Sequence, residues 1–256
     1  MFKQRMKVFS AGLAGTALVL LSGCSALTGG GDSDNGGETS ESGFTDVTNQ
    51  VASWDMCEVL PIDPIRDKVA ATAYAEGPNH VGMGSAIDTE AVSCRAEIEV
   101  PDTDGTIHWM SVTLAVFPGL STEHVDDMWG LRQDGWYRDN VETNARDLTA
   151  EDLLIDKDLE GDWDQAHAYA VMGTQGERSG EAGSMIVDAR TSNYIVEVYL
   201  TIPTDAEQTA AARYGLSQEE IDARTALAFD RTELVNWVAD EYIYTMFEAV
   251  SSQLES

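Results

Sequence analysis

The chain has 256 residues, of which 15 are basic and 45 acidic, so its formal net charge is −30. This balance argues against nucleic-acid binding through a basic patch and against electrostatic docking on an anionic membrane, because both need clustered Lys and Arg. Disorder of the whole chain is not indicated either, since 43% of the residues are hydrophobic. The composition therefore predicts an acidic, folded domain.

The N-terminus has the pattern of a secretory signal. Residues 1–7 carry three basic side chains and no acidic one, and residues 8–21 (VFSAGLAGTALVLL) are apolar. A helix that spans a bilayer takes about 20 residues, so this apolar run fits the core of a signal peptide better. Residues 21–24 (LSGC) resemble the lipobox of bacterial lipoproteins, in which the cysteine thiol is coupled to diacylglycerol. We predict a signal peptide over residues 1–23 and lipid attachment, with acyl chains such as palmitate, at Cys24; the alternative is a secreted protein with a chance cysteine.

A flexible tether is predicted to follow, over residues 24–46. Residues 25–43 (SALTGGGDSDNGGETSESG) are rich in Gly, Ser and acidic residues and contain no aromatic residue. Such a segment cannot bury enough apolar surface to offset the entropy of ordering its backbone. A single globular domain over residues 47–256 would then lie on the extracytoplasmic face of the cell membrane, held by the acyl chains on Cys24.

Two cysteines remain beside Cys24. Outside the cytoplasm, Cys57 and Cys94 are expected to form one disulfide. A metal site is the first alternative, but two cysteines without a nearby histidine pair are a weak ligand set. A cysteine nucleophile is the second, and it would need a base that the neighbouring sequence does not supply.

The first half of the domain reads as helices followed by a hairpin. Residues 54–60 predict a short helix that ends at Pro61, and Asp63 with Pro64 predicts the start of a second helix that runs to Gly77. Apolar and polar residues alternate over residues 94–100, which is the period of a half-buried strand. Residues 107–117 predict a second strand, and the turn residues 101–105 (PDTDG) join the two.

The second half repeats this order of elements. Ser121 is expected to cap a helix that ends before Gly135, residues 153–155 suggest a short helix, and residues 166–172 suggest a strand. Residues 184–190 and 194–202 predict another hairpin. Capping motifs at Ser217 and Asp230 predict C-terminal helices. The last helix has an apolar stripe that should pack on the sheet: Val235, Val238, Tyr242, Met246 and Ala249.

The predicted fold class is α+β, with an antiparallel sheet and helices packed on one face. Each half has a helix that leads to a strand pair, which leaves open two similar halves, although no residue-level repeat is visible.

Three short motifs together resemble a group of actinobacterial lipoproteins of unknown function. They are the lipobox at residues 21–24, the D-x-C helix at residues 55–60 (DMCEVL) and the strand that opens with Cys-Arg at residues 94–95. The resemblance implies that the two domain cysteines form a disulfide, and it implies no catalytic residue. Ala96 departs from the Trp that often follows Cys-Arg in that group. The chain is also similar to extracellular sensor-type domains of the same phylum.

One acidic segment partly matches the template of a calcium-binding loop. Residues 156–164 (DKDLEGDWD) place acidic residues at alternate positions, with Gly161 where such a loop needs its glycine. The twelfth place, which should be a glutamate, is His167, and an acidic surface loop is the alternative. The candidate ligands are Asp156, Asp158, Glu160 and Asp162.

No other metal, cofactor or catalytic motif is apparent. The four histidines form no zinc-type pair, and neither a serine-hydrolase elbow nor a phosphate-binding loop occurs. The sequence therefore favours a membrane-anchored, exported lipoprotein that binds an unknown protein or small molecule without catalysis. The alternative is a cell-envelope hydrolase that uses Asp and Glu carboxylates.

Overall fold

The computed structural model describes residues 44–85, 89–101, 107–133, 153–172, 182–203 and 227–256. The chain divides into two compact units, Met1–Ser40 and Glu41–Ser256, and every described residue belongs to the second. The predicted signal peptide, Cys24, nearly all of the predicted tether, the turn residues 102–105 and the capping motif at Ser217 lie outside the described residues. No helix within the described ranges is long and apolar enough to cross a membrane.

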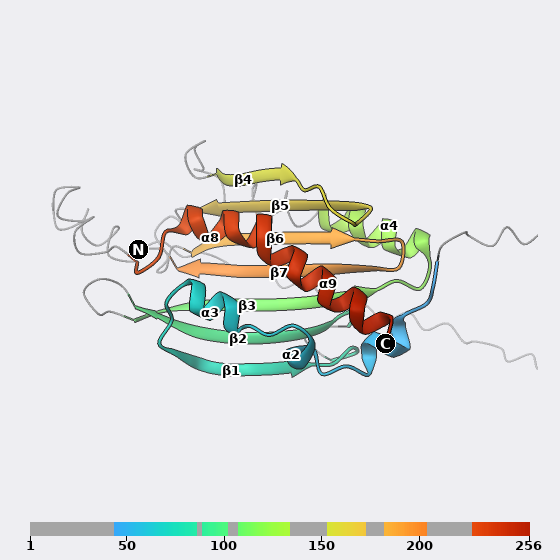
Figure 1. Ribbon diagram of the computed structural model, residues 1–256, viewed down its shortest axis with the longest axis horizontal. Coiled ribbons are helices and arrows are strands. Elements are labelled where there is room, and N and C mark those ends of the chain that lie inside the picture. The colour runs from blue at the N-terminus through green and yellow to red at the C-terminus, as the bar shows by residue number, and fades with distance from the viewer. Residues whose placement is uncertain (1–43, 86–88, 102–106, 134–152, 173–181, 204–226) are drawn as a thin grey trace, which may run out of the picture. The chain divides into compact units, whose positions relative to one another are not determined.

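Seven antiparallel strands form one sheet, in the order β1-β2-β3-β7-β6-β5-β4 (Figure 1). Only the central pair, β3 with β7, joins strands that do not follow one another in the chain. The sheet is thus a three-stranded and a four-stranded meander joined side by side, and the fold is mixed α+β as predicted. The strands are β1 (Ala73–Val81), β2 (Val92–Pro101), β3 (Ile107–Pro118), β4 (Leu153–Asp158), β5 (Gln165–Met172), β6 (Ala182–Arg190) and β7 (Tyr194–Pro203).

The two predicted hairpins are confirmed. In β2, alternate residues are buried, and Cys94 lies opposite Leu114 of β3 while Ile98 lies opposite Met110. In β7, Val196 and the residues two and four further along are buried on the same side. Because side chains of a strand alternate between faces, this pattern fixes which face of the sheet meets the core.

The C-terminal helical segment crosses that buried face diagonally (Figure 1). It consists of α8 (Arg231–Trp237), the π-helical turn η2 (Val238–Tyr242) and α9 (Ile243–Leu254). The Asp230 carboxylate caps α8 by accepting from the Glu233 N–H at 2.8 Å, as predicted. Val235, Val238 and Tyr242 belong to the same buried cluster as the strands, so the predicted apolar stripe does pack on the sheet. We call this side the helix face.

Three short N-terminal helices join the helix face: α1 (Thr48–Ala52), α2 (Met56–Val59) and α3 (Asp63–Lys68). The second predicted helix ends at Lys68. The prediction that it runs to Gly77 is therefore wrong. Ala70 adopts a positive φ of 52°, and the chain then pairs with β2 as the edge strand β1. An edge position tolerates the Gly and Pro that the sequence interpretation took as a helix end.

Two further expectations differ from the structure. Residues 153–155, interpreted as a short helix, begin β4, because pairing with β5 decides the conformation of this edge segment. In addition, α4 (Thr122–Leu131) packs on the face opposite the other helices, since Val125 and Met128 cluster with Ile195. The neighbouring Val196 points to the helix face, so helices lie on both faces of the sheet. We call the α4 side the outer face.

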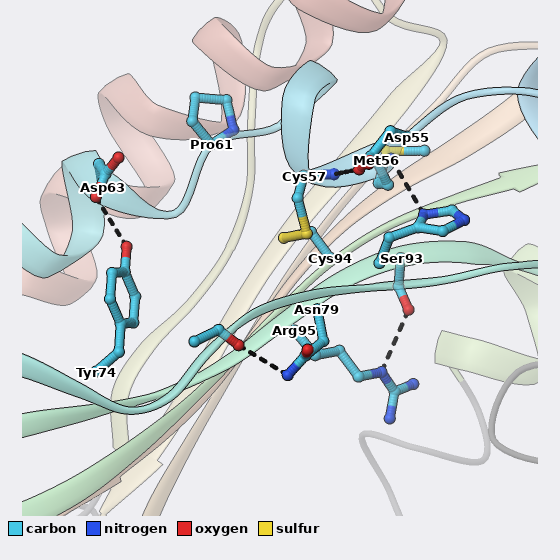
Figure 2. The surroundings of a disulfide bond; sticks show 12 residues. Asp55, Met56, Cys57, Pro61, Asp63, Tyr74, Asn79, Ser93, Cys94 and Arg95 are labelled. Atoms are coloured by element: carbon cyan, nitrogen blue, oxygen red, sulfur yellow. Dashed lines mark hydrogen bonds between the residues drawn. A yellow bond between two sulfur atoms is a disulfide. The ribbon is translucent and has the colours of Figure 1, made fainter.

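The predicted disulfide between Cys57 of α2 and Cys94 of β2 is confirmed, with a Cα–Cα distance of 4.8 Å (Figure 2). One side chain caps α2 and another joins it to the neighbouring strand β1. The Asp55 carboxylate accepts from the Cys57 N–H at 3.0 Å, and His80 Nδ1 of β1 accepts from the Met56 N–H at 3.2 Å. The short helix is therefore fixed to the sheet by one covalent bond and one polar contact.

Candidate functional site

The outer face carries the charged side chain that is most deeply buried among the described residues, Asp188 of β6, which has no exposed surface. It lies directly opposite Glu197 of β7. Arg132, the residue that ends α4, contacts both carboxylates, with 3.4 Å separating its Nε from Asp188 Oδ2. Its guanidinium also lies 4.1 Å from the ring centre of Phe117. These contacts anchor the end of α4 on the sheet.

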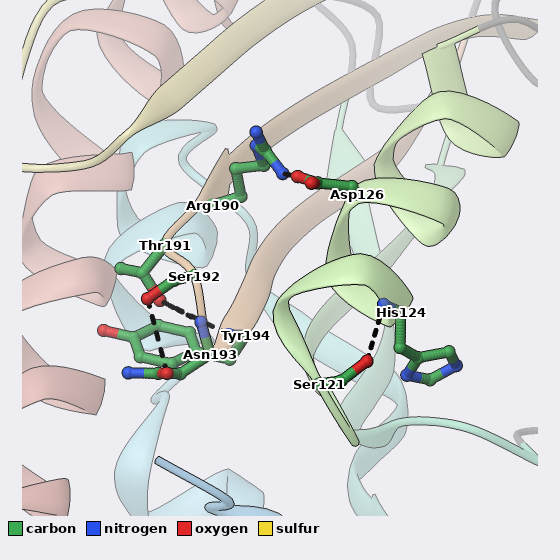
Figure 3. A network of polar contacts seen from close by, with 8 residues as sticks. All are labelled: Ser121, His124, Asp126, Arg190, Thr191, Ser192, Asn193 and Tyr194. Atoms are coloured by element: carbon green, nitrogen blue, oxygen red, sulfur yellow. Dashed lines mark hydrogen bonds and ion pairs between the residues drawn. The ribbon is translucent and has the colours of Figure 1, made fainter. Parts of the chain in front are cut away.

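A second arginine anchors the middle of the same helix. Arg190, at the end of β6, forms an ion pair with Asp126 of α4, and its guanidinium lies 5.7 Å from the Trp129 ring centre (Figure 3). Its Nε is buried and has no hydrogen-bond partner among the described residues. Two arginine contacts therefore position one face of α4, including Trp129, beside the ends of β5 and β6.

The start of α4 is fixed by the turn between β6 and β7. The Gly119 N–H donates to the Asn193 carbonyl at 2.7 Å. Figure 3 shows the second contact, in which Ser121 Oγ accepts from the His124 N–H at 3.1 Å. The predicted cap at Ser121 is thus confirmed. A Cβ atom at position 119 would overlap Val125, which explains why glycine stands where helix and turn approach most closely.

A polar pocket lies between α4 and the loop that joins β4 to β5. Its volume is about 280 Å³. Helix α4 and the residues directly after it supply Trp129 and Gln133, and the strand pair supplies the other lining side chains. We call it the α4 pocket; its lining residues are Trp129, Gln133, Asp158, Leu159, Asp164, Gln165, Ala166 and His167.

Gln133 is the most informative of these residues. Its amide Nε2 is buried and has no hydrogen-bond partner among the described residues. A buried amide donor without a partner costs roughly 1–3 kcal/mol, and such groups are uncommon in folded proteins. The residue lines the α4 pocket, while its Nε2 atom is shielded from solvent.

His167 of β5 is held between two carboxylates of β4. Its Nδ1 lies 2.9 Å from Asp158 Oδ1, and its Nε2 lies 3.0 Å from Asp156 Oδ1. Both contacts follow from the β4–β5 register, which places Asp158 directly opposite His167 and Asp156 opposite Tyr169. Burial, and secondarily the Asp156 charge, raises the pKa of Tyr169 to about 12. The imidazole is thus fixed in orientation at the pocket wall.

The four candidate calcium ligands do not form a loop. Asp156 and Asp158 lie in β4, where both contact His167, and the other two follow the strand. The next residue, Trp163, is buried and donates its indole N–H to the Leu159 carbonyl at 3.0 Å. Within the described ranges, no three His, Cys, Asp or Glu side chains are grouped as a metal ion would require.

A second hollow, of about 220 Å³, lies on the outer face of β1 to β3. Most of its lining residues are polar, and Arg95 Nε donates to Ser93 Oγ at 3.2 Å beside it. Trp109 follows on the same face of β3, where it is 68% exposed. The lining residues are Glu76, Asn79, Arg95, Ala96, Glu97, Ser111, Val112 and Thr113.

Sequence reasoning missed the α4 pocket. It singled out Asp158 and His167 only as parts of a calcium template, and it gave Trp129 and Gln133 no role. No short sequence motif marks these residues, because α4 and the β4–β5 loop are far apart in the sequence and come together only when the sheet forms. The fold and the pocket define a mixed α+β protein with a polar, ligand-sized site. Comparison of the chain with protein-family models, curated proteins and solved structures finds no match.

Proposed function

We propose that the protein is an exported lipoprotein, anchored through a lipid on Cys24 at the extracytoplasmic face of the cell membrane, that binds a small polar ligand. The observation that carries the proposal is the Cys57–Cys94 disulfide. Disulfides persist in oxidising compartments and are rare in the cytoplasm, so a disulfide supports an exported domain. The signal-like residues 1–23 and the lipobox-like residues 21–24 support the same route. We include in this proposal that the protein is similar to the actinobacterial lipoproteins that its three short motifs resemble.

Binding without catalysis is supported by the α4 pocket. Five polar side chains line it: Gln133, Asp158, Asp164, Gln165 and His167. Ligand pockets have a few convergent polar groups held in place by their scaffold. His167 is held by Asp156 and Asp158, and Arg190 holds the helix that carries Trp129. The site is therefore built to hold a molecule in one orientation.

The alternative is a carboxylate-dependent hydrolase, for which the α4 pocket offers Asp158 and Asp164, with Asp158 already in contact with His167. Such an enzyme needs two carboxylates on opposite sides of a cleft. Asp188 and Glu197 are the neighbouring carboxylates of the central outer face, but both contact Arg132 and neither lines one of the two hollows. Their contacts support a structural role in holding α4.

Lipid attachment is tested by growing cells with a palmitate analogue that can be labelled, and by separating membranes from the soluble fraction. The unaltered protein should carry the label and stay with the membrane through an alkaline carbonate wash. Cys24→Ala should lose the label and leave the membrane, because a chain with a net charge of −30 is repelled by anionic lipid. Ser22→Ala keeps a small residue before the cysteine and serves as the matched control. An unlabelled protein, or a Cys24→Ala variant that stays on the membrane, would refute the anchor.

A further inference from the structure

The outer face of β1 to β3 has no described helix over it, because α4 packs further across the sheet, over β7. It contains the hollow of about 220 Å³, which shares no lining residue with the α4 pocket. Next to the lining residue Ser111 on the same face of β3 stands Trp109, which is 68% exposed, and then Ile107, which is 44% exposed. Neighbouring exposed apolar side chains of this size mark interaction sites. We call this surface the β1–β3 face.

Trp109 leaves most of its surface open to solvent. No aromatic or cationic group in the described part of the chain contacts its ring. It differs in this respect from Trp129, whose ring lies beside the Arg190 guanidinium. The indole face is the best aromatic partner for a cation, and tryptophan is enriched among the residues that dominate the binding energy of interfaces. Trp109 is therefore available as an anchor for a partner.

Three carboxylates surround this anchor. Glu99 lies directly opposite Trp109 in the β2–β3 pair, so the two side chains adjoin. Glu97 is the next residue of β2 on this face, and Glu76 of β1 lies directly opposite it. Like charges in directly opposite positions destabilise a sheet, and none of the ion pairs within the described ranges involves these three residues. Arg95 is the one basic residue that the described part of this face carries, so the face is negative.

The charge of the face selects its occupant. A second copy of the chain would place carboxylates against carboxylates, and an anionic lipid surface would be repelled as well. A basic partner has the complementary charge, and it would relieve the repulsion between Glu76 and Glu97. The edge of β1 is interrupted by Pro78 and by register shifts on both sides of Glu76. Such interruptions prevent a partner from extending the sheet as a further strand, so the partner must lie on the face.

We propose that the β1–β3 face docks a basic, extended segment of a partner protein. An arginine of that segment stacks on the Trp109 ring and pairs with the Glu99 carboxylate, and an apolar side chain two residues away covers Ile107. Arginine fits better than lysine, because its planar guanidinium stacks on an aromatic ring and pairs with a carboxylate at the same time. This surface is a second binding site, separate from the ligand site proposed at the α4 pocket.

The test uses the full chain in a non-ionic detergent and a fluorescent probe peptide in which arginine, serine, leucine and serine follow one another twice. Alternate residues of an extended segment share a face, so this order presents arginine and leucine together. Matched peptides carry lysine or citrulline in place of arginine, and citrulline keeps the shape without the charge. Fluorescence anisotropy should give micromolar binding of the arginine peptide at physiological ionic strength. The lysine peptide should bind about threefold more weakly, and the citrulline peptide about tenfold more weakly or not at all.

Variants must separate the face from general attraction, because a net charge of −30 draws any cation toward the chain. Trp109→Ala should weaken binding of the arginine peptide about tenfold or more, and Glu99→Gln about fivefold. Leu131→Ala removes an equally exposed apolar side chain from α4, and Glu248→Gln makes the same change of charge at an exposed position of α9. Both controls should bind as the unaltered chain does. Since exposed substitutions change stability little, the melting temperature should stay the same in Trp109→Ala, which excludes misfolding as the cause.

Several results would overturn the inference. They are equal affinity for the arginine and citrulline peptides, unchanged affinity in Trp109→Ala, and a loss in Glu248→Gln as large as that in Glu99→Gln. A dimer in sedimentation equilibrium that Trp109→Ala dissociates would assign the face to a second copy and overturn the proposed partner. The Cys24→Ala chain should not bind vesicles of phosphatidylcholine and phosphatidylglycerol, and binding that depends on Trp109 would assign the face to lipid instead. None of the four face and control variants alters Cys24 or a lining residue of the α4 pocket, so failure here is distinguishable from failure of the proposed function.

Discussion

Reduction of the Cys57–Cys94 disulfide should lower the stability of the domain substantially without changing its native structure. The bond closes a loop of 37 residues and thus restricts the unfolded chain. In the chain-entropy model, a loop of this length contributes about 4 kcal/mol at 25 °C. For a domain of 150–250 residues, each kcal/mol shifts the melting temperature by about 2–4 °C, so a decrease of roughly 8–16 °C is expected.

The assay is thermal unfolding followed by far-ultraviolet circular dichroism, with and without a reductant, for the unaltered chain and for the double variant Cys57→Ala, Cys94→Ala. The reductant should lower the melting temperature of the unaltered chain and leave that of the double variant unchanged. Cys24→Ala is the control, because it retains the disulfide and should respond as the unaltered chain does. A melting temperature that reduction does not move would refute the argument, since it would mean that the loop is already restrained in the unfolded state.

Three further predictions concern the outer face. Arg132→Met removes the guanidinium beside the buried Asp188 and should cost about 3 kcal/mol or more in urea unfolding, with Arg132→Lys costing less; equal stability would contradict the buried ion pair. Gly119→Ala should cost about 1–3 kcal/mol in the same assay, because a Cβ would overlap Val125, and a neutral effect would show that α4 can shift. Burial raises the pKa of Tyr169 from 10 to about 12, so the folded state keeps this phenol neutral and its contribution to stability is lost as the pH rises from 10 through 12. Stability measured against pH should therefore fall less steeply in this window for Tyr169→Phe than for the unaltered chain, and parallel curves would refute the shift.

Much of the sheet could be predicted because its central strands carry their own pattern. In β2 and β7, alternate residues are buried on one face, and this alternation is visible in the sequence. The edge strands were missed for a physical reason. The segment Ala73–Val81 contains Gly77 and Pro78, and Leu153–Asp158 has no clean alternation, so only pairing with a neighbour makes them strands.

The candidate site was harder to predict because its lining residues come from segments that are far apart in the sequence. Gln133 and His167 are separated by more than thirty residues and meet only because α4 packs on the outer face while β5 lies beside it. The cysteine pair was predictable for the opposite reason, since only two cysteines were left to pair once Cys24 was assigned to the lipid. A sequence thus limits a covalent pairing much more tightly than it limits a pocket.

Four of the basic residues that the structure describes join different elements. Lys68 of α3 contacts the start of α8, Lys157 of β4 contacts η2, and Arg132 and Arg190 hold α4 on the sheet. Exposed pairs such as the two lysine contacts contribute little by themselves, because water and salt screen them. The two arginines are mostly buried, and Arg132 neutralises a carboxylate that would otherwise be costly to bury at Asp188. The surplus of acid is therefore a property of the surface, whereas the scarce arginines fix the helix that builds one wall of the α4 pocket.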